Sequence, residues 1–583
     1  MNVSHERNGV GYGRPRVVDY IVKHLVRRGI RHVFGVDGAN IEDLYDAAHS
    51  CPDITAVVAK HEFSAAAMAN AYGRTVAGIG VVAATSGGGA LNTIPGLGES
   101  LASRVPVLAL IGQPPTTSDG RGAFQDTSGV NGALDGTALF SAVSVSCQRV
   151  PTPADIVTAL PRALSAATRI GGPAVLLLPK NVQQGFVGAA ADDDTEAVPR
   201  RVGDIDPVIQ LLRGADGPVL IIAGDQVARD DARAELEQLR AALRATVATV
   251  PDAKDIVAAP SALGVTGVMG HPAVSAAIAE SAVCLVVGTR LPQIARSGLD
   301  EALGSTPTAS IGSAPPYLPC KHVDSDDLRA SLRALTTALT DSGHTTPRRP
   351  PGVTRSELAP PRHVGAGVRY RDAMVALDGL LPPGSDIAVD AGNIGAAAIH
   401  WLPARRDGRF LAALGMGGMG YSFGAGIGMA FARATRPDTK GPKPRHRAVV
   451  IAGDGAFFMH GMEIHTAVHY QLPVTFVLFD NHAHAMCATR EQLFYGDRYS
   501  YNRFGPSRLG AGLSAMFPTL PAADVTKLGE FDVAMKEALD VRGPSVVAVE
   551  CSADEIPPFA PFLEAITPKS TEAEEHRITP RER

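Results

Sequence analysis

The chain has 583 residues, of which 45% are hydrophobic, and a formal net charge of −5. This length predicts about three or four domains of an α/β protein with an ample core, and the slightly acidic charge excludes the basic surface of a nucleic-acid-binding protein. No apolar run is long enough to span a membrane, and the six cysteines form no C-x-x-C pair, so we expect free thiols in a reducing cytoplasm.

Short apolar runs alternate with helical stretches along the chain, which is the pattern of parallel sheets covered by helices. Two segments interrupt this pattern, because Gly188–Arg201 is small, charged and aperiodic, and Thr345–Arg362 is rich in proline. The charged end of the chain, 568–583, is expected to be disordered. These interruptions predict three α/β domains, at 15–187, 196–342 and 363–567.

The first of these domains contains three polar features. Glu62 follows an apolar run and begins the alanine-rich stretch HEFSAAAMANAYGR; a glutamate in a first helical turn has an ordinary role, because it complements the helix dipole. The glycine-rich turn Ser86–Gly89 is either a sharp corner or a close approach of the backbone to a ligand. Gln125 stands in the segment GAFQD, and a single glutamine of this kind is often a surface residue.

The middle domain has two runs, Val219–Asp225 and Cys284–Arg290, that predict strands entering turns. In the third domain, Asp390–Asn393 follows a strand predicted at Ile387–Val389. The glycine-rich segment LGMGGMGY comes next and includes Met419, which by itself would be interpreted as a core residue.

The next predicted strand, Ala448–Ala452, is a short run rich in β-branched residues. Gly453-Asp454-Gly455 ends it, and glycine there permits a tight turn. A helix through about Tyr470 should follow, with free N–H groups that favour an anion. A further strand, Val474–Phe479, is expected before Asn481.

If these two strands are parallel neighbours, Asp454 and Asn481 lie together at the carboxyl edge of the sheet, where such sheets bind ligands. Carboxylate and amide oxygens suit Mg²⁺ or Ca²⁺, and Mg²⁺ commonly completes its shell with phosphates and water. The plain alternative is that Asp-Gly is a turn and Asn481 a loop residue. The ordered set of strand, Gly-Asp-Gly, helix, strand and Asn favours a site for a metal-bridged diphosphate.

That ordered set resembles the cofactor signature of enzymes that depend on thiamine diphosphate. HEFSAAAMANAYGR, Ser86–Gly89, GAFQD and LGMGGMGY match further motifs of the family in the expected order, over roughly residues 15–565. The chain is most similar to the acetolactate synthase and 2-oxo-acid decarboxylase branch, which includes benzoylformate decarboxylase-like enzymes. The resemblance implies an α/β fold of three doubly wound parallel-sheet domains, which are the pyrimidine-binding, central and diphosphate-binding domains.

The resemblance also implies a role for individual residues. Mg²⁺ would be bound by Asp454, Asn481 and the backbone carbonyl of Ala483. Glu62 would hydrogen-bond the aminopyrimidine ring and promote the tautomer that deprotonates the thiazolium carbon. The residues expected to contact the cofactor are Glu62, Gly392, Asn393, Gly417, Met419, Gly453, Asp454, Gly455, Ala456, Asn481 and Met486.

Two of these residues would shape the cofactor, because Met419 would hold it bent and the carbonyl of Gly417 would accept from its amino group. Gln125 and the neighbouring Phe124 would face the reacting carbon. His484 is a further catalytic candidate, since a histidine can relay protons near neutral pH; the alternative is a loop histidine that only caps or packs.

Departures from the family pattern separate its branches. Pyruvate-decarboxylase-like members have paired histidines where Ser86–Gly89 stands and an acid where Cys487 stands, and this chain has neither. A well-placed acid protonates the carbanion and releases an aldehyde, whereas a carboligase must hold the carbanion for a second carbonyl. The synthases also use a lysine in the strand after the GAFQD region, and the corresponding run, Leu139–Val145, has none.

The central domain of acetolactate synthases holds FAD in a structural role. Their GARFDDR segment is replaced here by Gly288-Thr289-Arg290-Leu291-Pro292. We therefore expect no FAD, and a central domain that serves packing and assembly.

The sequence thus favours a thiamine-diphosphate- and Mg²⁺-dependent carboligase that decarboxylates a 2-oxo acid and adds the enamine to a second carbonyl. A simple decarboxylase that releases an aldehyde and a non-catalytic paralogue remain as alternatives. In the resembled family, the residues matching Glu62 and Asp454 reach one cofactor from different subunits, which implies a homodimer or homotetramer with shared active sites. The expected partners are small molecules, with neither nucleic acid nor membrane.

Overall fold

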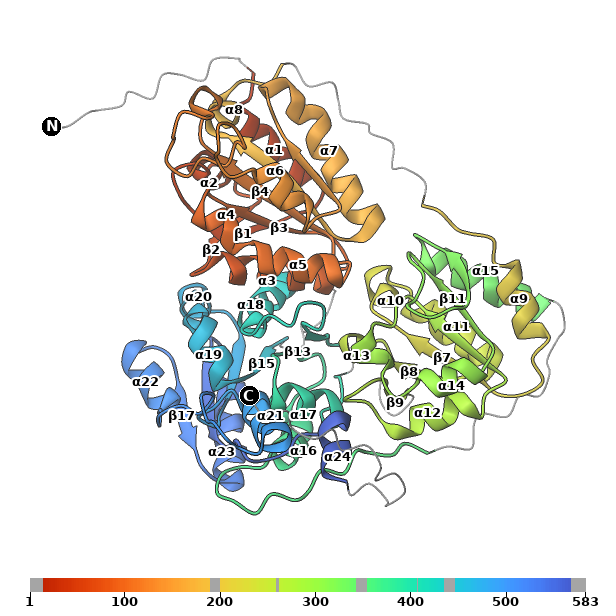
Figure 1. The fold of residues 1–583 in the computed structure, drawn as a ribbon. Coiled ribbons are helices and arrows are strands. Elements are labelled where there is room, and N and C mark those ends of the chain that lie inside the picture. Colours follow the sequence, from red (N-terminus) through yellow and green to blue (C-terminus); the bar gives the residue numbers. More distant parts are fainter. Residues whose placement is uncertain are drawn as a thin grey trace, which may run out of the picture.

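The computed structural model describes residues 14–188, 200–257, 262–341, 354–405, 407–434 and 446–567, which fold into three α/β domains (Figure 1). Each domain is built on a six-stranded parallel sheet with helices packed against it. The tail predicted to be disordered, most of the first predicted linker and half of the second lie outside the described residues. Among the described helices, none has the length and apolar character that crossing a membrane requires.

The N-terminal sheet has the strand order β2-β1-β3-β4-β6-β5. Its strands are β1 (His32–Val36), β2 (Thr55–Val58), β3 (Gly80–Ala84), β4 (Val107–Gln113), β5 (Ser146–Arg149) and β6 (Pro173–Pro179). The helices of this domain are α1 (Val17–Arg27), α2 (Glu42–His49), α3 (Glu62–Val76), α4 (Gly88–Asn92), α5 (Ile94–Ala102), α6 (Gly136–Ser141), α7 (Ile156–Ala166) and α8 (Lys180–Gln184).

The central sheet has the order β12-β11-β10-β7-β8-β9, which is the order of the dinucleotide-binding fold. Its strands are β7 (Val219–Ala223), β8 (Thr246–Thr249), β9 (Ala262–Val265), β10 (Val283–Val287), β11 (Thr308–Gly312) and β12 (Lys321–Asp324). The helices are α9 (Asp206–Arg213), α10 (Gln226–Arg229), α11 (Arg233–Leu243), α12 (Pro272–Ala279), α13 (Gln293–Arg296), α14 (Asp300–Ser305) and α15 (Leu328–Asp341).

The C-terminal sheet has the order β14-β13-β15-β16-β18-β17, which repeats the order of the N-terminal sheet. Its strands are β13 (Asp386–Val389), β14 (Phe410–Ala412), β15 (Ala448–Gly453), β16 (Val474–Asp480), β17 (Ala522–Val525) and β18 (Ser545–Glu550). The helices are α16 (Tyr370–Leu380), α17 (Asn393–Trp401), α18 (Tyr421–Ala434), α19 (Asp454–His460), α20 (Ile464–Tyr470), α21 (Ala485–Tyr495), α22 (Leu509–Met516), α23 (Leu528–Asp540) and α24 (Ala560–Ile566).

Two local expectations differ from the structure. The helix predicted from the Gly-Asp-Gly turn to about Tyr470 is broken into α19 and α20 by a 3₁₀ turn at Gly461–Glu463, where the Phe457 ring leaves no room for a side chain on Gly461. The run Leu139–Val145 is not a strand, because α6 occupies its first half and β5 begins only at Ser146.

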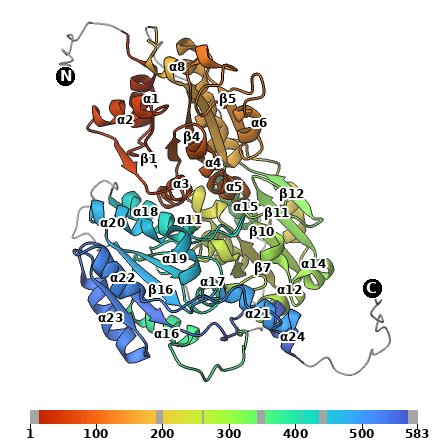
Figure 2. The ribbon, with the colours of Figure 1, turned by 60° about the vertical axis from the view of Figure 1, so that its left-hand side comes forward.

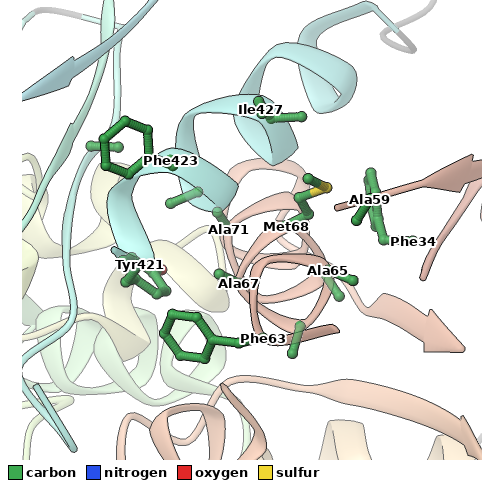
Figure 3. Packing of buried hydrophobic residues seen from close by; sticks show 14 of the residues in the cluster. Phe34, Ala59, Phe63, Ala65, Ala67, Met68, Ala71, Tyr421, Phe423 and Ile427 are labelled. Carbon is green, nitrogen blue, oxygen red and sulfur yellow. The ribbon is translucent and has the colours of Figure 1, made fainter. Parts of the chain in front are cut away.

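The N-terminal and C-terminal domains meet where α3 packs against α18 (Figures 1 and 2). Figure 3 shows the small side chains of α3, such as Ala67 and Ala71, facing α18 with its aromatic residues Tyr421 and Phe423. One continuous hydrophobic core therefore runs from the N-terminal sheet through both helices to the C-terminal sheet. The close approach depends on glycines of α18, because a Cβ atom on Gly428 would overlap the Met68 carbonyl oxygen.

We expect Gly428→Ala to lower the free energy of unfolding by about 1–3 kcal/mol, since one added methyl group must push two packed helices apart. Chemical denaturation of both proteins measures this change. Gly379→Ala in α16 is the matched control, because nothing surrounds its Cβ position, and it should change stability by less than about 1 kcal/mol. Equal stabilities for the two variants would contradict the packing described.

A buried ionic cluster joins all three domains. Asp225, at the end of β7, contacts Arg74 of α3 at 3.2 Å and Arg409, next to β14, at 2.8 Å. Arg409 also contacts Asp255 at 2.6 Å. Although burial alone would raise the pKa of Asp225, the two guanidinium groups hold it below its usual range. Loss of one partner would leave a buried charge unpaired, so the cluster fixes the relative positions of the domains.

Candidate active site

The strands β15 and β16 are parallel neighbours, with Gly453 opposite Phe479. This register brings Asp454 and Asn481 to the same carboxyl edge, as the sequence predicts. The backbone N–H of Ala483 donates both to Asp454 Oδ2 and to Asn481 Oδ1, at 3.1 Å in each case. Asp454 is buried, with 1% of its surface exposed. The Asp454 and Asn481 side chains and the Ala483 backbone therefore lie together in one buried region, where the contacts are made by the Ala483 N–H.

A second carboxylate, that of Asp480, belongs to the same cluster. The sequence analysis did not predict Asp480 as a site residue. Ligand atoms of Asp454, Asp480 and His482 all lie within 4.8 Å of one another. Burial and the Asp480 carboxylate raise the pKa of the Asp454 carboxyl well above its ordinary range. Two buried carboxylates repel each other, and a divalent cation between them removes that repulsion, so the donor set fits a hard cation. The sequence did contain a signal for Asp480, because this acidic residue directly follows the apolar run Val474–Phe479.

Next to this cluster, Gly455 lies beneath two candidate side chains. A Cβ atom on Gly455 would stand 2.5 Å from Cδ2 of His484 and 3.3 Å from Cε of Met419. The structure thus brings Met419, Gly455 and His484 together around one glycine. The His484 ring also stacks edge-on against Phe504, with ring centroids 4.7 Å apart, which holds the imidazole over the turn.

Two other candidates lie on the helices that follow β15 and β16, and a third lies in the segment before α18. Ala456 is buried in α19, and Met486 is half-buried in the first turn of α21. Gly417 has a φ of 65° and an exposed position in the glycine-rich segment before α18. This positive φ suits glycine and turns the backbone there.

The turn after β13 holds Asp390, Gly392 and Asn393. The Asp390 carboxylate accepts hydrogen bonds from the backbone N–H groups of Gly420 and Ser422, at 2.9 and 3.0 Å, so it anchors the start of α18. Gly392 has a φ of 99°, and no donor among the described residues reaches the buried Asn393 Oδ1. Such an unpaired atom marks a place where a bound group would complete the hydrogen bonding.

Glu62 and Gln125 form a separate group in the N-terminal domain. Asn92 Nδ2 donates to Glu62 Oε2 at 3.0 Å, and Glu62 is 8% exposed at the start of α3. Gln125 has a φ of 62° and accepts a hydrogen bond from Ser86 Oγ at 3.0 Å. In the described part of the chain, no hydrogen bond or ion pair links either residue to the C-terminal candidates.

The two groups adjoin through other residues that the sequence did not single out. Glu99 of α5 accepts hydrogen bonds from the backbone N–H groups of Gly415 and Met416, at 3.1 and 2.6 Å. The Phe63 ring, next to Glu62, lies against Gly418, next to Met419. The N-terminal domain thereby positions the glycine-rich segment, and no sequence spacing predicts contacts between residues so far apart in the chain.

A cavity of about 450 Å³ lies between the central domain and its neighbours. Three arginines from two domains line it, namely Arg104, Arg229 and Arg290. Met416 of the glycine-rich segment lines it as well. Arg290 stacks on the ring of Tyr317, 4.0 Å from its centroid.

The absence of FAD stays a prediction. The visible absorption spectrum of the purified protein checks it, because a flavin band would contradict it.

Three family models match the chain. They are the N-terminal TPP binding domain, the central domain and the C-terminal TPP binding domain of thiamine pyrophosphate enzymes, over residues 15–132, 205–315 and 390–549. Each match falls on one of the three sheets, and both groups of candidate residues lie in the two domains described as TPP binding.

Similar proteins cover nearly the whole chain. The "Probable acetolactate synthase large subunit" of Methanocaldococcus jannaschii is 27% identical, over 93% of this chain and 93% of that protein. Acetolactate synthase isozyme 2 large subunit of Escherichia coli is 26% identical, over 93% of this chain and 96% of that protein. The acetolactate synthase of Arthrospira platensis is also 26% identical, over 92% and 94%. The chain therefore belongs to the thiamine pyrophosphate enzymes, and it is similar to acetolactate synthases over nearly its whole length.

Proposed function

We propose that this enzyme binds thiamine diphosphate and Mg²⁺ and joins a 2-oxo acid, after loss of CO₂, to a second carbonyl compound. The cluster of Asp454, Asn481 and the Ala483 backbone at one strand edge carries the proposal, because it supplies oxygen ligands beside a glycine turn. Carboligation is favoured over aldehyde release because Cys487 stands, exposed, where an acid would protonate the carbanion.

When bound, the cofactor would supply the electron sink that makes loss of CO₂ possible. The residues of this chain would bind and orient it. The Asp454 and Asn481 side chains and the Ala483 carbonyl would hold Mg²⁺, while the turn at Gly392 and Asn393 would contact the bound group. Met419, above Gly455, would set the cofactor's shape by contact.

Proton handling would fall to Glu62 and His484. The Glu62 carboxyl, kept in place by Asn92, would exchange a proton with a ring nitrogen of the cofactor. His484 lies beside Gly455 and could hold or move a proton near the reacting atoms. Gln125 would contact the substrate carbonyl from the N-terminal domain.

We also propose a homodimer or homotetramer in the cytoplasm. Phe124, beside Gln125, is 84% exposed in the single chain, and a large apolar side chain next to a candidate site is commonly covered by a partner. All six cysteines are free thiols, which supports a reducing compartment. Light scattering of the purified protein would test the assembly, and a monomeric mass with cofactor bound would contradict it.

Product identification tests the function. Purified protein with thiamine diphosphate and Mg²⁺ is incubated with pyruvate, benzoylformate and branched 2-oxo acids, alone and in pairs, and the products are identified by mass spectrometry. We expect coupled hydroxyketone products. Aldehyde alone, even with acceptor in excess, would reject carboligation in favour of simple decarboxylation. Cofactor binding without any turnover would favour the non-catalytic paralogue.

Magnesium affinity is expected to rise with pH. Burial and Asp480 raise the pKa of Asp454 from its ordinary value of about 4 towards neutrality, so below that raised pKa the cation must displace a proton. The affinity should therefore fall as pH is lowered from neutral, and binding should release a proton. Calorimetry in two buffers of different ionisation enthalpy measures that release, and a pH-independent affinity would contradict it.

A further inference from the structure

A chain of three hydrogen-bonded side chains runs through the N-terminal domain and ends at Gln125. Asn40 Nδ2 donates to Ser86 Oγ at 2.6 Å, and Ser86 Oγ donates to Gln125 Oε1 at 3.0 Å. Ser86 is 0% exposed and Asn40 is 8% exposed, whereas Gln125 is half-buried. The chain therefore leads outward from the core to the candidate site.

The inner end of this chain is held firmly. The backbone N–H of Asn40 donates to Thr85 Oγ1 at 3.2 Å, and its carbonyl oxygen accepts from Gln183 Nε2 at 2.7 Å. At the outer end, Gly87 has a φ of 61°, and a Cβ atom there would stand 2.7 Å from Cγ of Gln125. Glycine at this position lets the glutamine side chain lie directly on the turn.

The direction of the hydrogen bonds follows from the groups involved. An amide NH₂ group can only donate, so the Ser86 oxygen accepts from Asn40, and its single hydrogen is left to donate outward. With the Asn40 NH₂ group on Ser86, the atom of Gln125 that meets this hydrogen is the carbonyl oxygen. The Nε2 group of Gln125 then points away from the chain, and among the described residues it has no acceptor.

We propose that Asn40 and Ser86 are positioning residues, which hold the Gln125 amide with its NH₂ group towards the reacting carbonyl. The inference rests on the proposed function, because Gln125 is assigned there to the substrate carbonyl. An oxygen that gains negative charge during addition is stabilised by an N–H donor already in place. Without Ser86, the amide can rotate and present its own carbonyl oxygen, which repels that charge.

A double-mutant cycle tests the proposal. The variants are Ser86→Ala, Gln125→Ala and the double variant, and kcat and KM are measured for each with cofactor and Mg²⁺ saturating. We expect Gln125→Ala to lower kcat about 100-fold, as for loss of one oxyanion donor, and Ser86→Ala to lower it about tenfold. Because Ser86 acts through Gln125, the double variant should be no slower than Gln125→Ala alone.

Ser100→Ala is the matched control. Ser100 is also 0% exposed and accepts a hydrogen bond from an asparagine, Asn70 Nδ2, at 2.9 Å, but it lies in α5 without contact to Gln125. Both serine variants should lower the melting temperature to a similar extent. Of the two serine variants, only Ser86→Ala should lower kcat. The effects of Ser100→Ala and Gln125→Ala on kcat should be additive.

Equal kcat for Ser86→Ala and Ser100→Ala would overturn the positioning role of Asn40 and Ser86, and so would additive effects of Ser86→Ala and Gln125→Ala. Both outcomes leave the proposed function intact. Absence of coupled products from the unchanged enzyme would instead reject the proposed function. In that case the same cycle is measured as the binding of an acylphosphonate analogue of the 2-oxo acid to the holoenzyme. Additive changes in that affinity for Ser86→Ala and Gln125→Ala would overturn the positioning role as well.

Discussion

The Glu62→Gln enzyme is expected to bind thiamine diphosphate and Mg²⁺ as the unchanged enzyme does, but to turn over at least about 100 times more slowly. Glutamine keeps the shape of the side chain and still accepts the hydrogen bond that Asn92 donates. Its amide cannot exchange a proton at neutral pH, so the cofactor is held but not activated. Initial rates and calorimetric cofactor affinity are measured on the same preparation.

Glu235→Gln supplies the control for this variant. Glu235 is 7% exposed, close to the 8% of Glu62, but it lies in α11 of the central domain and pairs with Arg333. Its replacement removes a buried charge without approaching the candidate site, so turnover should stay within about twofold of the unchanged enzyme while stability falls. Near-full activity of Glu62→Gln would contradict the role given to Glu62.

The second large effect is expected for Asp454→Ala, which should lose Mg²⁺-dependent cofactor binding. The variant removes one ligand oxygen and the charge that opposes the cation, while Asn481 and Ala483 remain. Without cation the variant should be at least as stable as the unchanged protein, because the repulsion between Asp454 and Asp480 is gone. Thermal unfolding with and without cofactor and Mg²⁺ therefore separates lost binding from lost folding.

For the unchanged protein, saturating cofactor and Mg²⁺ should raise the melting temperature, and for Asp454→Ala this increase should vanish. Asp524→Ala is the control, because its carboxylate also accepts backbone N–H groups, from Gly510 and Ala511 at 2.7 and 2.9 Å, in the same domain. That variant should keep the cofactor-dependent increase. A calorimetric affinity of Asp454→Ala equal to that of the unchanged protein would refute the assignment.

Much of the secondary structure near the site was predictable. The strands expected at Ala448–Ala452 and Val474–Phe479 appear as β15 and β16 with nearly the expected ends. Short β-branched runs between glycine turns have few other conformations, which explains the agreement. The single helix expected after the Gly-Asp-Gly turn was wrong, because a 3₁₀ turn at Gly461–Glu463 separates α19 from α20 and the apolar pattern does not reveal such a break.

Several residues of the site could not be found by reading along the chain. Asp480 lies beside Asp454 in the candidate cation cluster because β15 and β16 are paired in one register. Glu99 reaches Gly415 only because α5 lies against the C-terminal domain. The sequence also did not reveal that the first and third sheets share one strand order. Two domains can have the same backbone topology with entirely different side chains.

By itself the sequence determined the family, the three α/β domains and the order of motifs along the chain, because strand-turn-helix patterns and glycine turns are local properties. The tertiary structure decided which side chains share a site. The candidate cation cluster, the contact of α3 with α18 and the hydrogen bonds from Asn40 through Ser86 to Gln125 each join residues distant in sequence. Such contacts arise from sheet register and helix packing, in which the whole core takes part.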